Sequence, residues 1–125
     1  MKKIFLSEED KKSVGHYSPA IEHNGTIYVS GQLPLLKGQN IPASFDIEDQ
    51  TQLVLEKMET ILKAAGSNKD QVLRVTIYVT DLAYWPKVNA VYGKFFGDHR
   101  PARTIIPVNC LHYGCLLELE AIAFK

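Results

Sequence analysis

One segment constrains the fold more than any other: residues 46–66, "DIEDQTQLVLEKMETILKAAG". Its apolar residues recur at intervals of three and four, which predicts an amphipathic helix. Acidic residues at its start and Gly66 at its end are typical helix boundaries. The apolar stripe consists of Ile47, Val54, Met58, Ile61, Leu62 and Ala65. This stripe needs a second layer to cover it, and 125 residues suit one domain, so we expect residues 1–125 to form a single domain.

A β-hairpin precedes this helix in the sequence, at "AIEHNGTIYVSGQLP", residues 20–34. The dipeptide Asn24-Gly25 is a strong two-residue turn signal, because both positions tolerate a positive φ. The second strand should alternate between its two faces. Strict alternation places Ile27, Val29 and Gly31 on one face and Tyr28, Ser30 and Gln32 on the other.

Further along the chain, three strands and one more helix are expected. The strands are residues 71–81, 102–109 and 115–124, which are rich in β-branched or alternating apolar residues. The helix is residues 84–97, where Pro86 fits the first turn. Its apolar stripe consists of Val88, Val91, Tyr92 and Phe95. The order β-β-α-β-α-β-β predicts an α+β fold, a single mixed sheet with two helices on one face.

Several strands are apolar or half-apolar on both faces. In "RTIIPV", residues 103–108, one side carries Thr104, Ile106 and Val108 and the other carries Arg103, Ile105 and Pro107. If the helices cover one face of the sheet, a homo-oligomer packed sheet against sheet would cover the other. The alternative is a monomer whose second face is polar enough for water.

Charge and composition exclude some classes of protein. Lys plus Arg equals Asp plus Glu, at 14 each, so the chain has no basic excess to neutralise a nucleic-acid backbone. Apolar runs are too short to span a bilayer, and the N-terminus does not read as a signal peptide. We therefore expect a cytoplasmic protein whose Cys110 and Cys115 are reduced. The spacing C-x-H-x-x-C in "CLHYGC" is not a recognised zinc pattern, so a metal site is disfavoured.

The residues that could carry chemistry begin with Arg103 and two glutamates. Glu118 and Glu120 share one face of the last strand with apolar neighbours, where desolvation raises a carboxyl pKa. Sequential strands joined by a short connection usually pair antiparallel, which predicts that Arg103 lies beside Glu118 and Glu120. From pattern alone, a structural Arg–Glu ion pair is slightly favoured over a catalytic site.

Three other positions are candidates with ordinary alternatives. A glycine within a strand, as at Ser30-Gly31, marks either the close approach of a ligand or a β-bulge. Tyr17 lies in a polar, proline-containing segment and is more typical of a partly exposed aromatic residue. Asn89 lies among apolar residues of the second helix, which favours a hydrogen bond in helix packing.

Taken together, several motifs resemble the Rid family of reactive intermediate deaminases, also called YjgF-like and labelled endoribonuclease L-PSP or translation initiation inhibitors. They are "GHYSPAI", "IYVSGQLP", "LEKMETILKAAG" followed by "VLRVTIYVTDL", "VNAVYGKFF", "RPART" and "LELEAIA". The resemblance covers almost the whole chain. It implies a chorismate-mutase-like fold assembled as a homotrimer with a central barrel and sites between subunits.

The resemblance also implies an activity: 2-iminobutanoate and 2-iminopropanoate are hydrolysed to 2-oxo acids and ammonia, without a metal or organic cofactor. By the same resemblance, Arg103 binds the substrate carboxylate and Glu118 positions or activates the attacking water. Tyr17, Ser30 and Gly31 would line the pocket, with Asn89 near it. Small 2-imino and 2-oxo acids are the implied partners. The neutral charge disfavours nucleic acid as a partner, and the short apolar runs give no reason to expect a membrane.

Two positions depart from the family pattern. Ile105 occupies a site where many members carry cysteine, and His16 replaces the usual proline before Tyr17. The absent cysteine leaves hydrolysis intact but removes a pocket thiol. Two other functions remain open: a trimer that binds small 2-oxo acids or regulates partners without catalysis, and an endoribonuclease or translation inhibitor, which the neutral charge disfavours.

Overall fold

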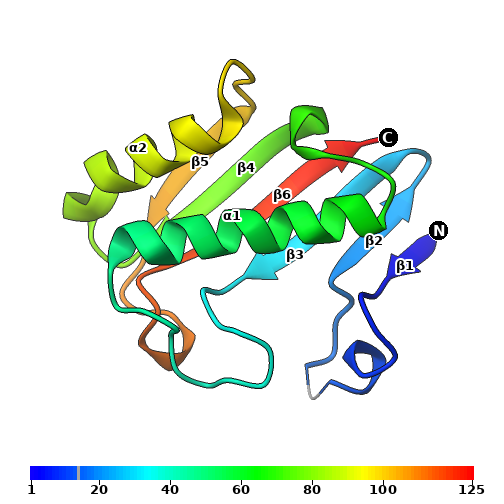
Figure 1. The fold of residues 1–125 in the computed structure, drawn as a ribbon, viewed down its shortest axis with the longest axis horizontal. Helices are drawn as coiled ribbons and strands as arrows, with labels where there is room; N and C mark the ends of the chain where they lie inside the picture. Colours follow the sequence, from blue (N-terminus) through cyan, green and yellow to red (C-terminus); the bar gives the residue numbers. More distant parts are fainter. Residues whose placement is uncertain (14) are drawn as a thin grey trace.

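The computed structural model describes residues 1–13 and 15–125. Six strands form one mixed sheet, and helices α1 (Ile47–Ala64) and α2 (Trp85–Phe96) lie side by side on the same face of it (Figure 1). The predicted single mixed sheet with two helices on one face is therefore confirmed.

The sheet contains one strand that the sequence did not reveal. Its strands are β1 (Lys2–Ile4), β2 (Ala20–His23), β3 (Thr26–Gln32), β4 (Val72–Val79), β5 (Ala102–Pro107) and β6 (Leu117–Phe124). Across the sheet the order is β1-β2-β3-β6-β4-β5. The additional strand, β1, is three residues long and pairs antiparallel with β2. Such a short strand is too brief to display an alternation in the sequence.

The predicted pairing of the last two strands is wrong. β5 pairs in parallel with β4, and β6 lies on the other side of β4, antiparallel to both β4 and β3. The segment β4–α2–β5 is a β-α-β crossover, which returns the chain alongside β4 in the same direction. Arg103 on β5 is consequently separated by β4 from the strand that carries the glutamates.

The core lies between α1, α2 and the sheet. The predicted acidic start of α1 is confirmed, and Asp46 caps the helix, because its side chain accepts hydrogen bonds from the backbone amides of Glu48 and Asp49. The odd-numbered residues of β6, such as Leu117 and Leu119, are fully buried under the helices. The opposite face of the sheet is not covered in the single chain. We call it the open face; it carries Tyr28, Thr76, Tyr78, Ile106, Glu118, Glu120 and Ile122.

The predicted hairpin is present, but its second strand does not alternate throughout. Asn24 and Gly25 form the turn with φ values of 52° and 80°. The register of β3 against β6 then shifts between Val29 and Gln32, which is a β-bulge. Gln32 is buried as a result and Gly31 is exposed, the reverse of the predicted assignment.

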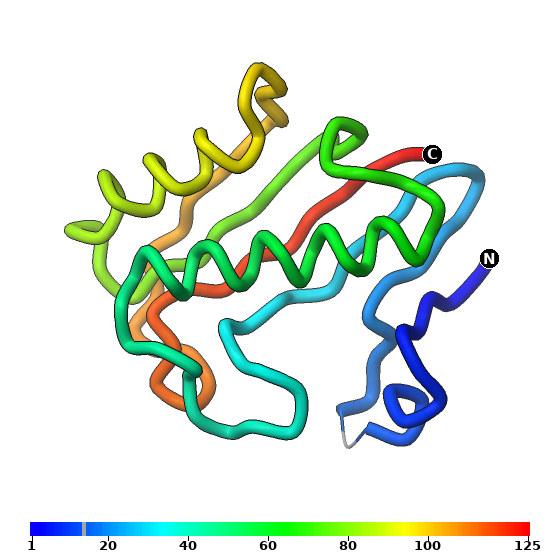
Figure 2. The backbone as a smooth tube through the Cα atoms, in the orientation of Figure 1, coloured from blue at the N-terminus to red at the C-terminus, as the bar shows by residue number. Residues whose placement is uncertain are grey.

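A half-buried lysine fixes the start of the loop between β3 and α1, which Figure 2 traces. Lys57 Nζ, on α1, donates hydrogen bonds to the carbonyl oxygens of Leu33 at 2.7 Å and Leu35 at 2.9 Å. Burial lowers the pKa of Lys57. These two bonds tie the chain that follows the bulge to the helix layer. In the part of the chain that the structure describes, no helix has the length and apolarity needed to cross a membrane.

Candidate functional site

Arg103 lies on the helix side of the edge strand β5, against α2. Its guanidinium carbon is 4.5 Å from the ring centroid of Trp85 and 4.7 Å from that of Tyr92. Nη1 donates a hydrogen bond of 3.1 Å to Oδ1 of Asn89. The side chain nevertheless remains exposed. The Arg–Glu ion pair favoured from the pattern is therefore wrong, and the Asn89 amide binds the arginine instead of serving helix packing.

Tyr92 is the buried member of this group. Its side chain packs against Phe96, with ring centroids 4.7 Å apart, and its hydroxyl has no hydrogen-bond partner among residues 1–13 and 15–125. Burial raises the pKa of Tyr92 to about 12, against an opposing effect of the Arg103 charge. The phenol is neutral at any physiological pH, so its ring face is available to the guanidinium without a competing ion pair.

Glu118 lies on the open face and its carboxylate rests against Gly31 of β3. A Cβ atom placed on Gly31 would be 2.8 Å from Glu118 Oε2. Burial raises the pKa of Glu118; nearby His112 lowers it and Glu120 raises it further. A carboxyl group of this kind exchanges protons closer to neutral pH than an exposed glutamate does. The predicted desolvation of Glu118 is confirmed.

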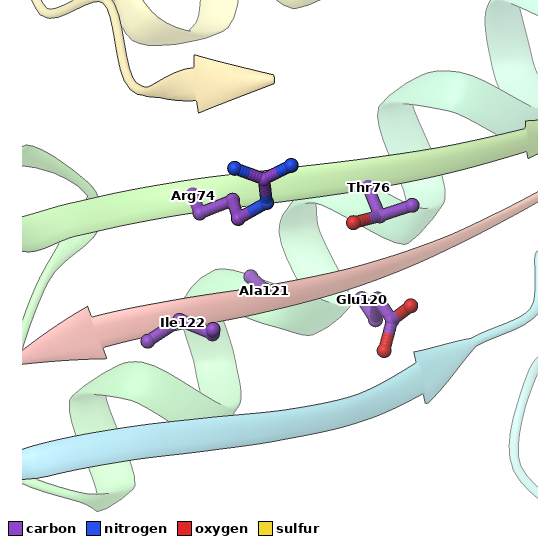
Figure 3. A pocket seen from close by; sticks show the side chains of 5 residues that line it. All are labelled: Arg74, Thr76, Glu120, Ala121 and Ile122. Atoms are coloured by element: carbon purple, nitrogen blue, oxygen red, sulfur yellow. The ribbon is translucent and has the colours of Figure 1, made fainter. Parts of the chain in front are cut away.

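The neighbouring glutamate is held by a tyrosine. Tyr78 donates its hydroxyl to Glu120 Oε1 at 2.5 Å, and this bond is the main cause of the raised pKa of Tyr78. Next to this pair the open face has a hollow of about 200 Å³ (Figure 3). The residues lining it are Arg74, Thr76, Glu120, Ala121 and Ile122. Arg74 Nη2 also donates to Thr104 Oγ1 at 2.8 Å, so the two charged groups of the lining, Arg74 and Glu120, are already hydrogen-bonded within the chain.

Tyr17, Ser30 and Gly31 are neighbours through the backbone. Ser30 Oγ donates to the carbonyl oxygen of Ser18 at 2.6 Å, and Ser30 N donates to that of Pro19 at 2.9 Å. These bonds hold the segment following Tyr17 beside the bulge. The Tyr17 side chain is 61% exposed, as the sequence predicts for a partly exposed aromatic residue. Of the two alternatives for Gly31, the β-bulge is confirmed. The group that approaches it closely within the chain is the Glu118 side chain.

The predicted site residues thus fall into two groups that do not meet within one chain. The arginine group is Arg103 with Asn89, on the helix side of the sheet. The glutamate group is Glu118 with Gly31, Ser30 and Tyr17, around the open face. Strand β4 lies between β5 and β6, so the two groups are separated by a strand and by the thickness of the sheet.

The positions that depart from the family pattern have separate surroundings. Ile105 is half-buried and packs against the core on the arginine side of β5, while His16 is exposed. Cys110 is an exposed thiol, and Cys115 is buried with its pKa raised by that burial. Residues 1–13 and 15–125 contain no group of three or more His, Cys, Asp or Glu side chains placed to hold a metal ion.

Trp85 was not predicted from the sequence as a site residue, and Tyr92 was predicted only as part of the apolar stripe of its helix. Positions 85, 89 and 92 follow helical spacing, so their side chains share one face of α2. An aromatic–amide–aromatic row on one helix face, followed by an arginine on the next strand, was the pattern that could have identified the arginine group. No sequence pattern indicated that His112 lies near Glu118, because the turn at His112–Gly114 brings it there.

Comparison with known proteins gives consistent matches. A family model described as Endoribonuclease L-PSP matches residues 8–125. A RutC family protein of Pyrococcus horikoshii is 38% identical over 125 residues, spanning 100% of this chain and 99% of the relative. Reactive Intermediate Deaminase A, chloroplastic, of Arabidopsis thaliana is 37% identical over 98% of this chain and 65% of its own length. The structure of Escherichia coli TdcF with bound serine has a TM-score of 0.87 at 31% identity and covers 99% of both chains.

Proposed function

Because the chain belongs to the Rid family, the family that the Endoribonuclease L-PSP model covers, we propose that it is a 2-iminobutanoate/2-iminopropanoate deaminase. The observation that carries this proposal is the state of Arg103. Its guanidinium is exposed, is oriented by Trp85 and Asn89, and forms no ion pair with a carboxylate among residues 1–13 and 15–125. Such a group is suited to a substrate that brings its own carboxylate.

The substrate class follows from the bonding capacity of this arginine. A guanidinium has five N–H donors, and Asn89 uses one of them, so two parallel N–H groups remain for a carboxylate. A 2-imino acid presents a carboxylate directly bonded to the electrophilic imine carbon. Serine in the Escherichia coli TdcF structure likewise carries a carboxylate next to a nitrogen-bearing carbon. Both facts support a small 2-imino or 2-oxo acid as the ligand.

The proposed reaction adds water across the C=N bond. Glu118 accepts a proton from the attacking water while the oxygen bonds to the carbon of the protonated imine. Glu118 returns this proton to the nitrogen of the resulting carbinolamine, and the C–N bond then breaks. As ammonia leaves, the hydroxyl gives its proton to Glu118 and becomes the carbonyl of the 2-oxo acid, and ammonia takes that proton from Glu118 to depart as ammonium. The raised pKa of Glu118 supports this role, because the same group must take up a proton and return it.

The site is assembled from two copies of the chain in a homotrimer. Within one chain the arginine and glutamate groups lie on opposite sides of the sheet, and the open face that bears Glu118 also carries exposed apolar side chains, Tyr28 and Ile106 among them. Packing open faces around a threefold axis covers these side chains. It also brings the Glu118 of one subunit toward the Arg103 of its neighbour.

The first experiment compares wild type with Arg103→Ala. An amino-acid oxidase or a threonine dehydratase generates the imine, semicarbazide traps what remains, and the loss of trapped product measures hydrolysis. Arg103→Ala should lower kcat/KM by about 100-fold or more, because truncation removes a charge-assisted pair to the substrate. Arg103→Lys should recover little, since an ammonium cannot form the two parallel bonds.

The outcomes separate the three functions. Rapid imine loss with wild type and its absence with Arg103→Ala support the deaminase. Binding of 2-oxobutanoate without any turnover, by a protein of trimer mass, would replace it with the non-catalytic binding protein. Cleavage of a single-stranded RNA probe, lost in a point variant and weakened by salt, would support the endoribonuclease that the family model's description names.

A further inference from the structure

The aromatic surroundings of Arg103 have a role that the proposed reaction does not by itself require. Ring centroids within about 6 Å of a guanidinium attract it electrostatically, Trp being the strongest partner. Both Trp85, at 4.5 Å, and Tyr92, at 4.7 Å, meet this condition. The arginine is thus held against two rings although its side chain is exposed.

The rings belong to a rigid element. Trp85, Asn89 and Tyr92 lie on one face of α2, and Tyr92 anchors that face in the core, where it is 6% exposed. The Asn89 amide fixes the rotation of the guanidinium in its plane by accepting from Nη1. Two ring contacts and one hydrogen bond together define the position and the plane of the group.

An arginine on an exposed edge strand otherwise samples many rotamers, and binding a ligand would have to select one of them. Holding the side chain in place before the ligand arrives removes that entropic cost from the binding step. Arg74 differs from Arg103: it donates a hydrogen bond to Thr104, and within the part of the chain that the structure describes no aromatic ring lies against its guanidinium.

We propose that Trp85 and Tyr92 are positioning residues for ligand binding, forming an aromatic seat that orients the free edge of the Arg103 guanidinium toward the carboxylate of a 2-imino or 2-oxo acid. This inference rests on the carboxylate-binding role of Arg103 in the proposed function. Trp85 is the residue on which to test it, because it is half-buried, whereas Tyr92 is part of the core and its loss would disturb folding.

The test uses three single variants. Trp85→Leu removes the ring, Trp85→Phe keeps a ring, and Phe95→Leu is the matched control. Phe95 is also a half-buried aromatic residue of α2, but its cation contact is with Lys69 at 5.0 Å. Thermal unfolding and the oligomer mass of each variant establish that the fold and assembly are retained.

The first readout needs no ligand. The Arg103 Nε–Hε NMR resonance, assigned by its loss in Arg103→Lys, should be shifted by ring currents in wild type. Trp85→Leu should move it toward the position of free arginine, while Trp85→Phe keeps part of the shift and Phe95→Leu leaves it unchanged.

The second readout is affinity. Calorimetric Kd values for 2-oxobutanoate should rise about 3- to 30-fold in Trp85→Leu, the range that a cation–π contact covers between exposed and desolvated sites. KM for the imine should rise in parallel while kcat stays within about twofold, because the seat acts on binding and does not touch the reacting carbon. Trp85→Phe should recover most of the loss.

If folded Trp85→Leu keeps the wild-type Arg103 resonance position and the wild-type Kd for 2-oxobutanoate, the positioning role of Trp85 is wrong. The proposed deaminase activity is not affected by that result. If wild type binds 2-oxobutanoate but hydrolyses no imine, the proposed enzyme fails, and the resonance and Kd series still decide the seat. If Arg103→Ala binds 2-oxobutanoate as wild type does, both proposals fail together.

Discussion

Gly31 is the residue at which the backbone of β3 contacts the proposed proton acceptor of β6, Glu118. It lies at the bulge of β3, and the Glu118 carboxylate of β6 occupies the space where a side chain would begin. Its backbone φ is not in the left-handed region, so alanine is conformationally acceptable there. What glycine provides at this position is room, and the group that needs the room is the proposed proton acceptor.

Gly31→Ala should therefore lower activity without unfolding the protein. The new methyl group would lie 2.8 Å from Glu118 Oε2, the mobile end of a side chain, so the carboxylate moves and the backbone does not. Displacing it by about 1 Å should lower kcat roughly 10- to 100-fold. Steady-state kinetics and a thermal melt measure the two effects. A folded variant with unchanged kcat would mean that the position of Glu118 does not matter to the reaction.

The site residues themselves show what a sequence reveals at this scale. Arg103, Glu118, Gly31, Ser30, Tyr17 and Asn89 were all named from motifs that lie within short segments. Their mutual contacts were not predicted, because the ring contacts of Arg103 and the approach of Glu118 to Gly31 join segments far apart in the chain. Motif residues can be recognised within a short segment of sequence, whereas side-chain contacts between strands depend on the folded arrangement of distant segments.

At the scale of elements, the two helices were predictable and one pairing was not. Helix α1 begins at its acidic cap and buries the predicted stripe, because helical periodicity and capping are properties of consecutive residues. The pairing partner of β5 depends on where the β4–α2–β5 crossover brings the chain back to the sheet. Neighbouring position in the sequence favours β6 as a partner as strongly as β4, whereas the structure pairs β5 with β4. β6 pairs with β3 on one edge and β4 on the other, and its residues that face the helices, such as Leu117 and Leu119, are fully buried.

A glycine within α2 and the glycine that follows its last residue give opposite predictions for stability. Gly93 lies within the helix and an added Cβ meets nothing within 4 Å, so Gly93→Ala should raise the free energy of unfolding by about 0.5–1 kcal/mol. Gly97, which ends the helix at φ 66° and ψ −126°, has equal space but a conformation that L-residues avoid. Gly97→Ala should lower the free energy of unfolding by about 1 kcal/mol or more.

Urea denaturation of both variants measures these differences under identical conditions. Since neither glycine is near Glu118, Gly93→Ala also serves as an activity control for Gly31→Ala. Destabilisation by Gly93→Ala would mean that its exposed surface is used in assembly rather than left to solvent.

At the scale of the whole molecule, the sequence indicated an uncovered apolar face before the structure located it. Tyr28 is 50% exposed and Ile106 is 37% exposed on the open face, beside Glu118, Glu120 and Ile122. A single chain of 14.1 kDa leaves this surface in water, whereas three such chains, about 42 kDa together, could cover it as the proposed homotrimer. Oligomeric state depends on how the surfaces of separate chains fit together, so the homotrimer stays a proposal.

The separation of Arg103 from Glu118 by β4 predicts that variants of these two residues complement one another in mixed oligomers. If each site takes its arginine from one subunit and its glutamate from the next, Arg103→Ala and Glu118→Gln should each be inactive alone, yet rescue one another in mixed trimers. Refolding them together in equal amounts should restore about a quarter of the sites, since each needs one particular neighbour pair. Mixing Arg103→Ala with Arg103→Lys is the matched control and should restore none. Mixed trimers seen by native mass spectrometry without recovered activity would mean that the two residues do not share a site across subunits.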